Sequence, residues 1–152
     1  MCGIAGIVNF NTSDHVREQD ILTMMEKMKH RGPDDQGTYI AENLGFGFVR
    51  LSILDLSIAG HQPMFSEDKR YMIIFNGEVY NYIEIREELK DKYHFKTGTD
   101  TEVILTAYQE WGADCLDRFN GMFAFVILDT QTKEVFGGRL NAMIGIWVGL
   151  QL

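Results

Sequence analysis

Apolar residues fall into short runs separated by polar and glycine-containing segments. Runs of this length and composition are typical of buried strands, and they cover residues 4–10, 38–41, 44–53, 71–75 and 122–128, with a further strand from residue 135 onward. Two segments carry apolar residues every three or four positions, which predicts amphipathic helices over residues 17–29 and 101–111. A third, more charged helix is expected from Asn81 to about Tyr93, with Glu84 completing a capping-box pair.

The order of these segments joins strands in hairpins and sets the helices apart from them. Turn signals occur at residues 42–43 and 129–132, and residues 76–78 break the apolar run that precedes them. Because strands and helices do not alternate one by one, the pattern predicts an α+β fold with a mostly antiparallel sheet. No repeat or internal boundary is visible, so we expect residues 1–152 to form a single domain.

Composition places the chain among globular proteins and disfavours several partners. Of the 152 residues, 45% are hydrophobic and 24% are charged, which suits a packed core. The net charge of −8 argues against nucleic acid, because phosphate binding needs clustered Lys and Arg. No apolar run is long enough to span a membrane, and no secretory signal is visible. Two cysteines make no disulfide framework, so we expect a cytoplasmic protein.

The first candidate for chemistry is Cys2, which follows the initiator Met1. Removal of Met1 would leave one residue that carries both a thiol and a free α-amino group. An α-amine has a reference pKa of about 7.7–8.0, so it can serve as the base for an adjacent nucleophile. Position alone favours another interpretation, in which Cys2 is only a small residue without a catalytic role. Cys115 lies in an apolar helical stretch and is expected to be part of the core.

Seven motifs in order along the chain resemble one known family. They are Cys2-Gly3-Ile4-Ala5-Gly6, Arg31-Gly32-Pro33-Asp34, Arg50-Leu51-Ser52-Ile53-Leu54-Asp55, Gly60-His61-Gln62-Pro63-Met64, Phe75-Asn76-Gly77-Glu78-Val79-Tyr80-Asn81, Thr97-Gly98-Thr99-Asp100-Thr101-Glu102-Val103 and Gly121-Met122-Phe123-Ala124-Phe125. Together they resemble the glutaminase domain of class II glutamine amidotransferases, most of all its asparagine-synthetase branch. Any one motif would be a weak signal, whereas seven in order over residues 2–139 are specific.

The resemblance implies a particular form of the α+β fold. This is the four-layer αββα sandwich of the N-terminal-nucleophile hydrolases, in which two antiparallel sheets pack face to face between helices. It also implies an enzyme that hydrolyses glutamine to glutamate and ammonia through a glutamyl thioester, without a metal or a cofactor. ATP would be used only by a synthetase domain. The four histidines show no spacing typical of metal ligands, so the residues themselves also argue against a metal site.

Three residues would carry the catalysis if the resemblance holds. The Cys2 sulfur would attack the side-chain amide carbon of glutamine, and the α-amine of Cys2 would take and return the thiol proton. The side-chain amide of Asn76 and the backbone N–H of Gly77 would stabilise the oxyanion that this attack creates. Considered without the other motifs, Asn76-Gly77 is more typical of an ordinary hairpin turn.

Further residues would bind the substrate. The resemblance assigns Arg50 to the α-carboxylate of glutamine, for which a planar guanidinium is suited. It assigns Asp100 to the substrate ammonium and Glu78 to a second polar contact. The remaining pocket positions are Leu51, Ile53, Leu54 and Gly98. The residues alone leave other interpretations open: Arg50 as a surface charge, Asp100 as a helix N-cap, and the three aliphatic side chains as plain strand core.

After residue 139 the sequence departs from the family pattern. Residues 140–152 are uncharged and unlike the expected continuation, so we expect a domain truncated at its C-terminus. The chain has no Ser-Gly-Gly-x-Asp phosphate loop, so a separate synthetase subunit is a candidate partner. A truncated or frameshifted product, a designed fragment and a free-standing glutaminase are all compatible with this pattern. An apolar end at a sheet edge would also favour a homo-oligomer.

The sequence therefore supports two hypotheses of different classes. The first is a glutaminase that acts on L-glutamine and supplies ammonia for an asparagine-synthetase-type amidation, active only once Met1 is removed. The second is a catalytically inactive glutamine-binding or interaction remnant of such a domain. The ammonia acceptor is not encoded in these motifs.

Overall fold

The computed structural model of the chain describes residues 2–52, 58–141 and 144–150. The first sheet is antiparallel and contains β1 (Gly3–Val8), β2 (Asp35–Ala41) and β3 (Leu44–Arg50), in the spatial order β1-β3-β2. Gly3 pairs with Val49. The preceding residue, Cys2, is therefore brought beside Arg50 at the end of this sheet.

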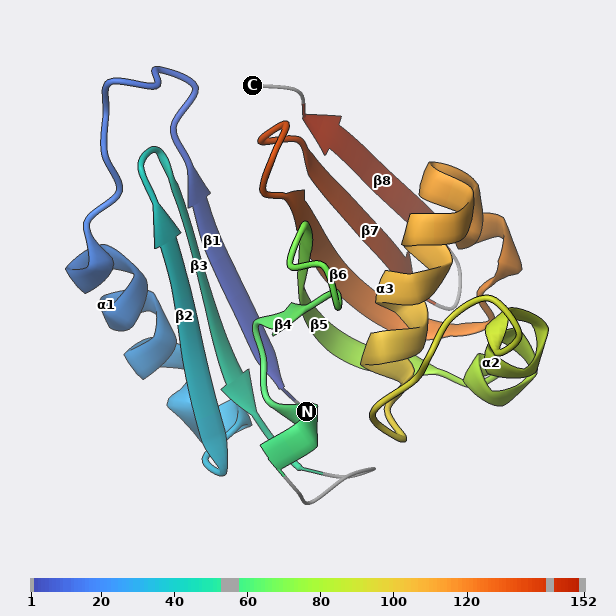
Figure 1. Cartoon of the computed structure of the whole chain (residues 1–152). Helices are drawn as coiled ribbons and strands as arrows, with labels where there is room; N and C mark the ends of the chain where they lie inside the picture. Colours follow the sequence, from blue (N-terminus) through green and yellow to red (C-terminus); the bar gives the residue numbers. More distant parts are fainter. Residues whose placement is uncertain (1, 53–57, 142–143, 151–152) are drawn as a thin grey trace.

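The second sheet has five antiparallel strands in the order β4-β5-β6-β7-β8. They are β4 (Met64–Phe65), β5 (Tyr71–Val79), β6 (Gly121–Asp129), β7 (Val135–Asn141) and β8 (Ile144–Leu150). The long pair β5–β6 lies at the centre of this sheet, and β8 lies at one edge (Figure 1). In the stretch where the sequence departs from the family, residues 140–141 thus belong to β7 and residues 144–150 form β8.

Helices cover the outer faces of both sheets. α1 (Glu18–Met28) packs on the first sheet, while α2 (Tyr82–Leu89) and α3 (Asp100–Trp111) lie outside the second (Figure 1). The shorter 3₁₀ helices are η1 (Lys29–Arg31), η2 (Ile58–Gly60) and η3 (Gly112–Arg118). The predicted α+β fold with an αββα arrangement is confirmed. Within the described ranges, no helix has the length and apolarity needed to cross a membrane.

Three clusters of buried side chains hold these layers together. A central cluster fills the space between the sheets and includes Leu44, Phe46, Phe48, Met72, Ile74, Leu128 and Val135, with Cys2 packed against it. A larger cluster lies between the second sheet and its helices, and it contains the fully buried Cys115, as expected. Burial raises the pKa of the Cys115 thiol to about 12, which keeps that thiol protonated and unreactive.

Aromatic residues and glycines alternate in β3, so one face of the strand packs on the second sheet and the other packs on α1. Phe46 and Phe48 point toward the second sheet, as period-2 geometry requires. The intervening glycines face α1, because a Cβ added to Gly45 would lie 2.6 Å from Val16, and one added to Gly47 would lie 2.7 Å from Met25. Glycine therefore lets α1 approach the strand closely.

The predicted break at residues 76–78 is wrong, because β5 continues through them to Val79. Asn76 pairs with Ala124 and Gly77 pairs with Phe123 on β6. Gly77 has φ +144°, and a Cβ there would lie 2.2 Å from the Met122 carbonyl oxygen. The Asn-Gly pair supplies a local backbone distortion inside a paired strand instead of a chain reversal.

The predicted capping box at Asn81 is also wrong. Asn81 is the N-cap residue of α2 but makes no side-chain cap hydrogen bond. Its Nδ2 donates to the Arg118 carbonyl at 2.8 Å, and its Oδ1 accepts from Asn120 N–H at 2.9 Å. Asn81 therefore ties the start of α2 to the segment leading into β6. α2 itself ends at Leu89, four residues before the predicted end at Tyr93.

Candidate active site

A cavity of about 260 Å³ opens where the ends of the two sheets meet. Its walls come from the N-terminus and β3, from the segment around η2, from the second half of β5, and from the start of α3. The lining residues are Cys2, Phe48, Arg50, Leu51, Gly60, Gln62, Phe75, Asn76, Gly77, Glu78, Tyr80, Thr99, Asp100, Thr101 and Met122. A cavity of this size suits a small metabolite, because pockets for larger ligands span about 300–1,000 Å³.

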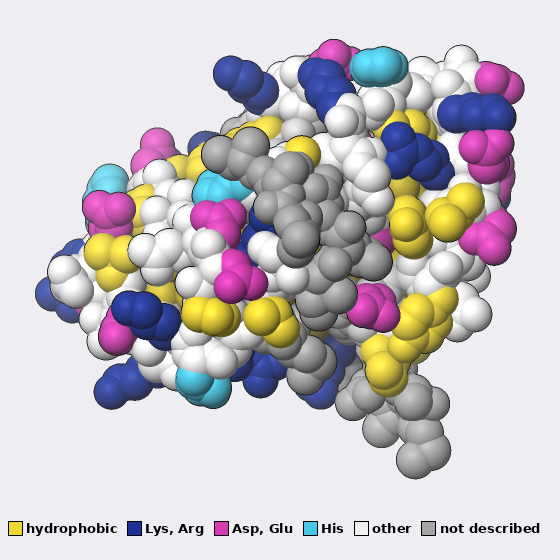
Figure 2. Space-filling view, turned by 90° about the horizontal axis from the view of Figure 1, so that it is seen from below, with side chains coloured by type: hydrophobic (Ala, Val, Ile, Leu, Met, Phe, Trp, Pro, Cys, Tyr) yellow, Lys and Arg dark blue, Asp and Glu magenta, His cyan; other side chains and the backbone are white. Residues whose placement is uncertain are grey.

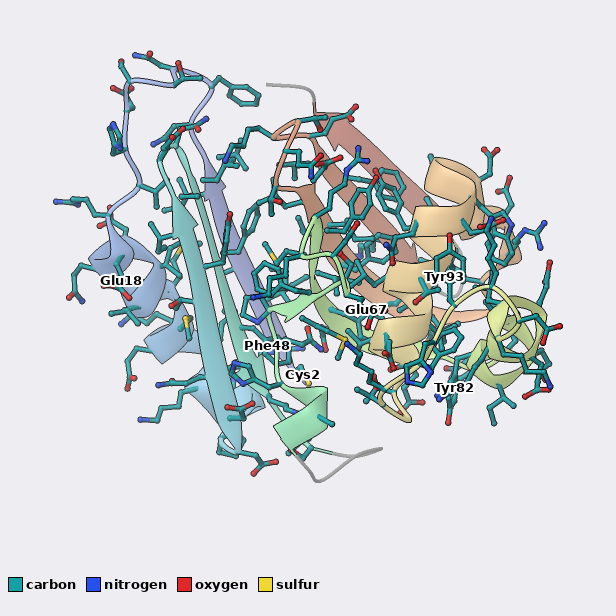
Figure 3. All side chains as sticks on the ribbon, in the orientation of Figure 1. Cys2, Glu18, Phe48, Glu67, Tyr82 and Tyr93 are labelled. Carbon is teal, nitrogen blue, oxygen red and sulfur yellow. The ribbon has the colours of Figure 1, made fainter. Side chains whose placement is uncertain are left out.

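Cys2 contributes a thiol to the wall of this cavity. Figure 3 shows Cys2 and Phe48 close together in the space between the two sheets. The Leu51 N–H donates to the Cys2 sulfur at 3.4 Å, and the sulfur lies 3.6 Å from the Leu51 carbonyl oxygen. The Cys2 carbonyl accepts a hydrogen bond from Arg31 Nε at 3.0 Å. These contacts fix the position of the N-terminal residue against β3, with the sulfur at the cavity wall.

Asn76 and Gly77 face Cys2 from the opposite sheet. Asn76 lies two residues after Ile74, whose side chain is in the central cluster between the sheets, so strand periodicity turns Asn76 toward the same space. Gly77 lines the cavity through its backbone. The close approach of Met122 and Phe123 leaves no room for a Cβ at Gly77. The distorted strand thus presents an amide side chain and a backbone amide to one cavity.

Arg50 is buried, with 7% of its surface exposed, so it is not a surface charge at a strand end. Glycines make room for it and for its backbone. A Cβ at Gly60 would lie 2.1 Å from Arg50 Nη2, and one at Gly32 would lie 2.5 Å from Arg50 N. The guanidinium therefore lies directly against η2. Buried in this way, it supplies a fixed positive group to the cavity, as binding of a carboxylate requires.

Asp100 is the buried acidic group of the cavity, only 4% exposed. Its Oδ2 accepts a hydrogen bond from Val79 N–H at 3.1 Å. Burial raises the pKa of the Asp100 carboxyl to about 6, although the hydrogen bonds from Val79 and Thr101 act in the opposite direction. The nearby charge of Glu78, which is exposed at the cavity edge, raises this pKa further. A cation bound beside Asp100 would stabilise its charged form.

The N-cap of α3 is Thr99, not Asp100, so the interpretation of Asp100 as a cap is wrong. Thr99 accepts a hydrogen bond from Glu102 N–H at 3.3 Å. The Glu102 carboxylate in turn accepts hydrogen bonds from the backbone N–H groups of Lys96 and Thr97, at 2.8 and 2.7 Å. These hydrogen bonds fix the first turn of α3, and the Asp100 carboxylate is turned toward β5.

The structure places the other expected pocket residues as follows. Leu51 lines the cavity and contacts Cys2 through its backbone, as described above. Ile53 and Leu54 lie outside the described residues. Gly98 is exposed in the turn before α3 and is not among the residues that line the cavity. Its role in substrate binding stays a prediction.

Gln62 and Thr101 are among the cavity residues that the sequence motifs alone did not assign to a role. Gln62 is buried and connects by hydrogen bonds to Phe75 and to Thr101. Both Gln62 and Thr101 belong to motifs that carry the family resemblance, which is the one signal that could have selected them. The two hydrogen-bond partners of Gln62 lie 13 and 39 residues away from it in the chain, so no local sequence pattern indicates these contacts.

The described part of the chain contains no group of three His, Cys, Asp or Glu residues placed to hold a metal ion. On the face shown in Figure 2, Lys and Arg side chains are interspersed with acidic and uncharged ones. His61 near the cavity is instead paired with Asp35, at 2.7 Å between Nδ1 and Oδ2.

Comparison with known proteins identifies the family and relatives of the chain. Residues 1–142 match the family described as glutamine amidotransferase domain. The chain is 44% identical over 142 residues to asparagine synthetase (glutamine-hydrolyzing) 1 of Bacillus subtilis (strain 168), covering 91% of this chain and 22% of that protein. It is 40% identical over 139 residues to asparagine synthetase B (glutamine-hydrolyzing) of Escherichia coli (strain K12), covering 91% of this chain and 25% of that protein.

The fold comparison agrees. The structure superposes on glutamine phosphoribosylpyrophosphate amidotransferase from B. subtilis with a TM-score of 0.73 at 18% identity, covering 90% of this chain and 36% of the other. The chain thus spans about a quarter of the length of the asparagine synthetases that it matches. The match over residues 1–142, together with these relatives and this fold, shows that the chain belongs to the family of class II glutamine amidotransferase domains.

Proposed function

We propose that this domain hydrolyses L-glutamine to L-glutamate and ammonia, with Cys2 as the nucleophile. The observation that carries the proposal is the composition of one cavity. It brings together the thiol of Cys2, the buried guanidinium of Arg50 and the buried carboxylate of Asp100. The distorted strand adds the side-chain amide of Asn76 and the backbone amide of Gly77. Each group matches one chemical requirement of glutamine or of its hydrolysis.

Recognition of glutamine needs two opposite charges at fixed positions. The α-carboxylate would bind the Arg50 guanidinium, which can donate two parallel hydrogen bonds. The α-ammonium would bind Asp100, with Glu78 at the cavity edge as a second polar contact. These two anchors leave the side-chain amide of the substrate to extend toward Cys2, so that the reacting atoms meet in a defined orientation.

In the first chemical step the Cys2 sulfur forms a bond to the amide carbon of glutamine. The thiol proton passes to the α-amine of Cys2, which is free only after removal of Met1. The carbonyl oxygen becomes an oxyanion, which the side chain of Asn76 and the N–H of Gly77 would stabilise. The C–N bond then breaks, the α-amine returns the proton, and ammonia leaves behind a glutamyl thioester.

In the second step a water molecule attacks the thioester. The same α-amine takes a proton from the water, the C–S bond breaks, and the sulfur is reprotonated as glutamate leaves. The oxyanion formed here would use the same two donors, Asn76 and Gly77. The reaction balances with water as the only co-reactant, so it requires no cofactor on this chain.

We further propose that the ammonia serves an asparagine-synthetase-type amidation. The support is the identity of the relatives, which are glutamine-hydrolyzing asparagine synthetases. The matched region is about a quarter of their length, so the amidation and its use of ATP would reside outside the residues described above. A synthetase subunit or domain is the corresponding partner.

The competing hypothesis is a glutamine-binding domain without catalysis. Ammonia and glutamate released from L-glutamine decide between the two, when the N-terminus has first been verified by mass spectrometry to begin at Cys2. We expect equal amounts of the two products, with release lost in Cys2→Ala. Arg50→Lys, which keeps the charge but cannot donate in the planar bidentate geometry, should raise KM more than it lowers kcat. Equal release by the protein and by Cys2→Ala would overturn the proposal.

A further inference from the structure

We propose that Gln62 is a positioning residue that holds the oxyanion-binding strand and the ammonium-binding helix at a fixed separation. This inference rests on the proposed glutaminase function and adds a residue to it. Gln62 touches neither reacting atom in that mechanism. It acts through the two elements that its side-chain amide connects, β5 and α3.

The side chain of Gln62 makes one hydrogen bond to each element. Its Oε1 accepts from the backbone N–H of Phe75 at 2.6 Å, and its Nε2 donates to Thr101 Oγ1 at 3.3 Å. The orientation of the amide is fixed chemically, because the Phe75 N–H can only face an acceptor. Gln62 is 4% exposed, so water is not a ready substitute for either partner.

Both partners are direct neighbours of residues assigned to the reaction. Phe75 precedes Asn76, the side-chain donor to the oxyanion. Thr101 follows Asp100, the proposed ligand of the substrate ammonium. The Gln62 amide therefore connects the point where the substrate reacts to the point where its α-amine is held, through one side chain and two hydrogen bonds.

The segment that carries Gln62 is itself held in place. A Cβ at Gly37 would lie 2.1 Å from the Gln62 carbonyl oxygen, so β2 packs directly on this backbone. Two residues earlier, Gly60 packs against the Arg50 guanidinium. The short segment from Gly60 to Gln62 thus contacts Arg50 and α3, which supply the two substrate anchors, and β5, which carries the oxyanion donors.

A side-chain amide suits this connection, because it carries a hydrogen-bond acceptor and a donor side by side. It must accept from the Phe75 N–H and donate to the Thr101 hydroxyl, and a side chain such as Met fills similar space without doing either. Loss of the connection would let β5 and α3 shift relative to one another. Because a displacement of about 1 Å in substrate position can cost on the order of 100-fold in rate, a small shift would be visible in kinetics.

The test compares steady-state kinetics of Gln62→Met and Thr101→Val with those of the unaltered protein. We expect kcat/KM for L-glutamine to fall roughly 10- to 100-fold in Gln62→Met. Thr101→Val breaks only the link to α3, so it should raise KM while changing kcat less. Thr101→Ser keeps the hydroxyl and should restore most of the activity lost in Thr101→Val.

Two controls separate positioning from a general loss of structure. The rate of Cys2 alkylation by iodoacetamide needs neither anchor and should stay within about twofold in every variant. Asn43 is another buried amide, 4% exposed and donating to the Asn9 carbonyl at 2.7 Å, but it lies outside the cavity. Asn43→Leu should therefore lower stability by a similar amount while leaving kcat/KM of the folded protein unchanged.

The outcomes distinguish this inference from the proposed function. If the unaltered protein releases no more ammonia than Cys2→Ala, the proposed function itself fails. If the unaltered protein is active and Gln62→Met keeps its kcat/KM once the folded fraction is taken into account, the positioning role of Gln62 is overturned. Failure of Thr101→Ser to restore activity would overturn the link to α3.

Discussion

At the scale of single residues, Asp100 shows how this site sets function against stability. Its carboxyl is almost fully buried and its pKa is raised to about 6, mainly because burial penalises the charged form. The unfolded chain binds fewer protons at this position between the reference pKa of 3.8 and about 6. Folding stability therefore falls as pH rises through that window, and the destabilisation is fully present above it.

Replacement of Asp100 by Asn tests whether the buried Asp100 carboxylate destabilises the fold at high pH. We expect Asp100→Asn to raise the free energy of unfolding at pH 8 by on the order of 1–3 kcal/mol, since each pKa unit corresponds to about 1.4 kcal/mol. The gain should shrink toward pH 4, as measured by urea unfolding at both pH values. The same variant should lose at least about 100-fold in kcat/KM. A gain in stability that is independent of pH would contradict the assignment.

The residues of the site differ in how far the sequence could predict them. Cys2, Arg50, Asn76 and Asp100 were identified because they stand in motifs that resemble a family. Their convergence on one cavity agrees with that resemblance. Gln62 could not be identified in this way, because its importance lies in hydrogen bonds to residues 13 and 39 positions away. Such contacts are fixed by tertiary packing and leave no periodic signal in the sequence.

At the scale of elements, β5 is the strand whose local sequence misleads. Asn-Gly is a strong hairpin signal, yet the strand continues because nine residues of β5 pair with β6. The distortion at Gly77 is accommodated within this ladder. The strands β1, β2, β3 and β6 and the helices α1 and α3 lie close to their predicted positions, because their apolar patterns are uninterrupted. By contrast, α2 ends four residues before its predicted end.

Substitution at Gly77 should therefore be costly. Gly77→Ala places a Cβ 2.2 Å from the Met122 carbonyl oxygen at a φ of +144°, and we expect a loss of roughly 2–4 kcal/mol in unfolding free energy. Gly98→Ala is the matched control, because nothing lies within 4 Å of its added Cβ. Gly98→Ala should stay within about 0.5 kcal/mol. Similar Tm values for the two variants would contradict the strand geometry.

The start of α2 offers a second test at this scale. Asn81→Ala removes two tertiary hydrogen bonds, to Arg118 and Asn120, so we expect a loss of about 1–2 kcal/mol in unfolding free energy. Glu84→Ala would be equally harmful if a capping box existed, but in this structure it should change stability by less than about 0.5 kcal/mol. A larger effect of Glu84→Ala than of Asn81→Ala in thermal unfolding would restore the capping-box interpretation.

At the scale of the whole molecule, the site exists only because two sheets meet. Arg50 belongs to the first sheet and Cys2 directly precedes its strand β1, whereas Asn76 and Gly77 belong to the second sheet. The central cluster of apolar side chains sets the separation of the two sheets. The sequence predicts strands joined in hairpins, and the resemblance to the family predicts the sandwich of two sheets. The arrangement of side chains between the sheets follows from packing and could not be read from periodicity.

Substitutions in the central cluster should all lower stability, but only those of residues that line the cavity should also lower activity. Phe48→Ala removes a fully buried ring that also lines the cavity, so we expect a loss of about 3–5 kcal/mol in stability and a lower kcat/KM. Leu44→Ala, in the same cluster but away from the cavity, should lose about 2–5 kcal/mol while the folded fraction keeps its kcat/KM. Equal kinetic effects of the two variants, measured under conditions where both are folded, would contradict this separation.

The central claim is that Cys2 forms a glutamyl thioester in this cavity, and chemical interception of that thioester tests it most directly. The measurement is the formation of γ-glutamyl hydroxamate from L-glutamine and hydroxylamine, by protein whose N-terminus begins at Cys2. Hydroxylamine attacks the thioester in place of water, so the account predicts hydroxamate formation by the unaltered protein and none by Cys2→Ala. Ammonia release without hydroxamate, or hydroxamate formed equally by Cys2→Ala, would contradict it.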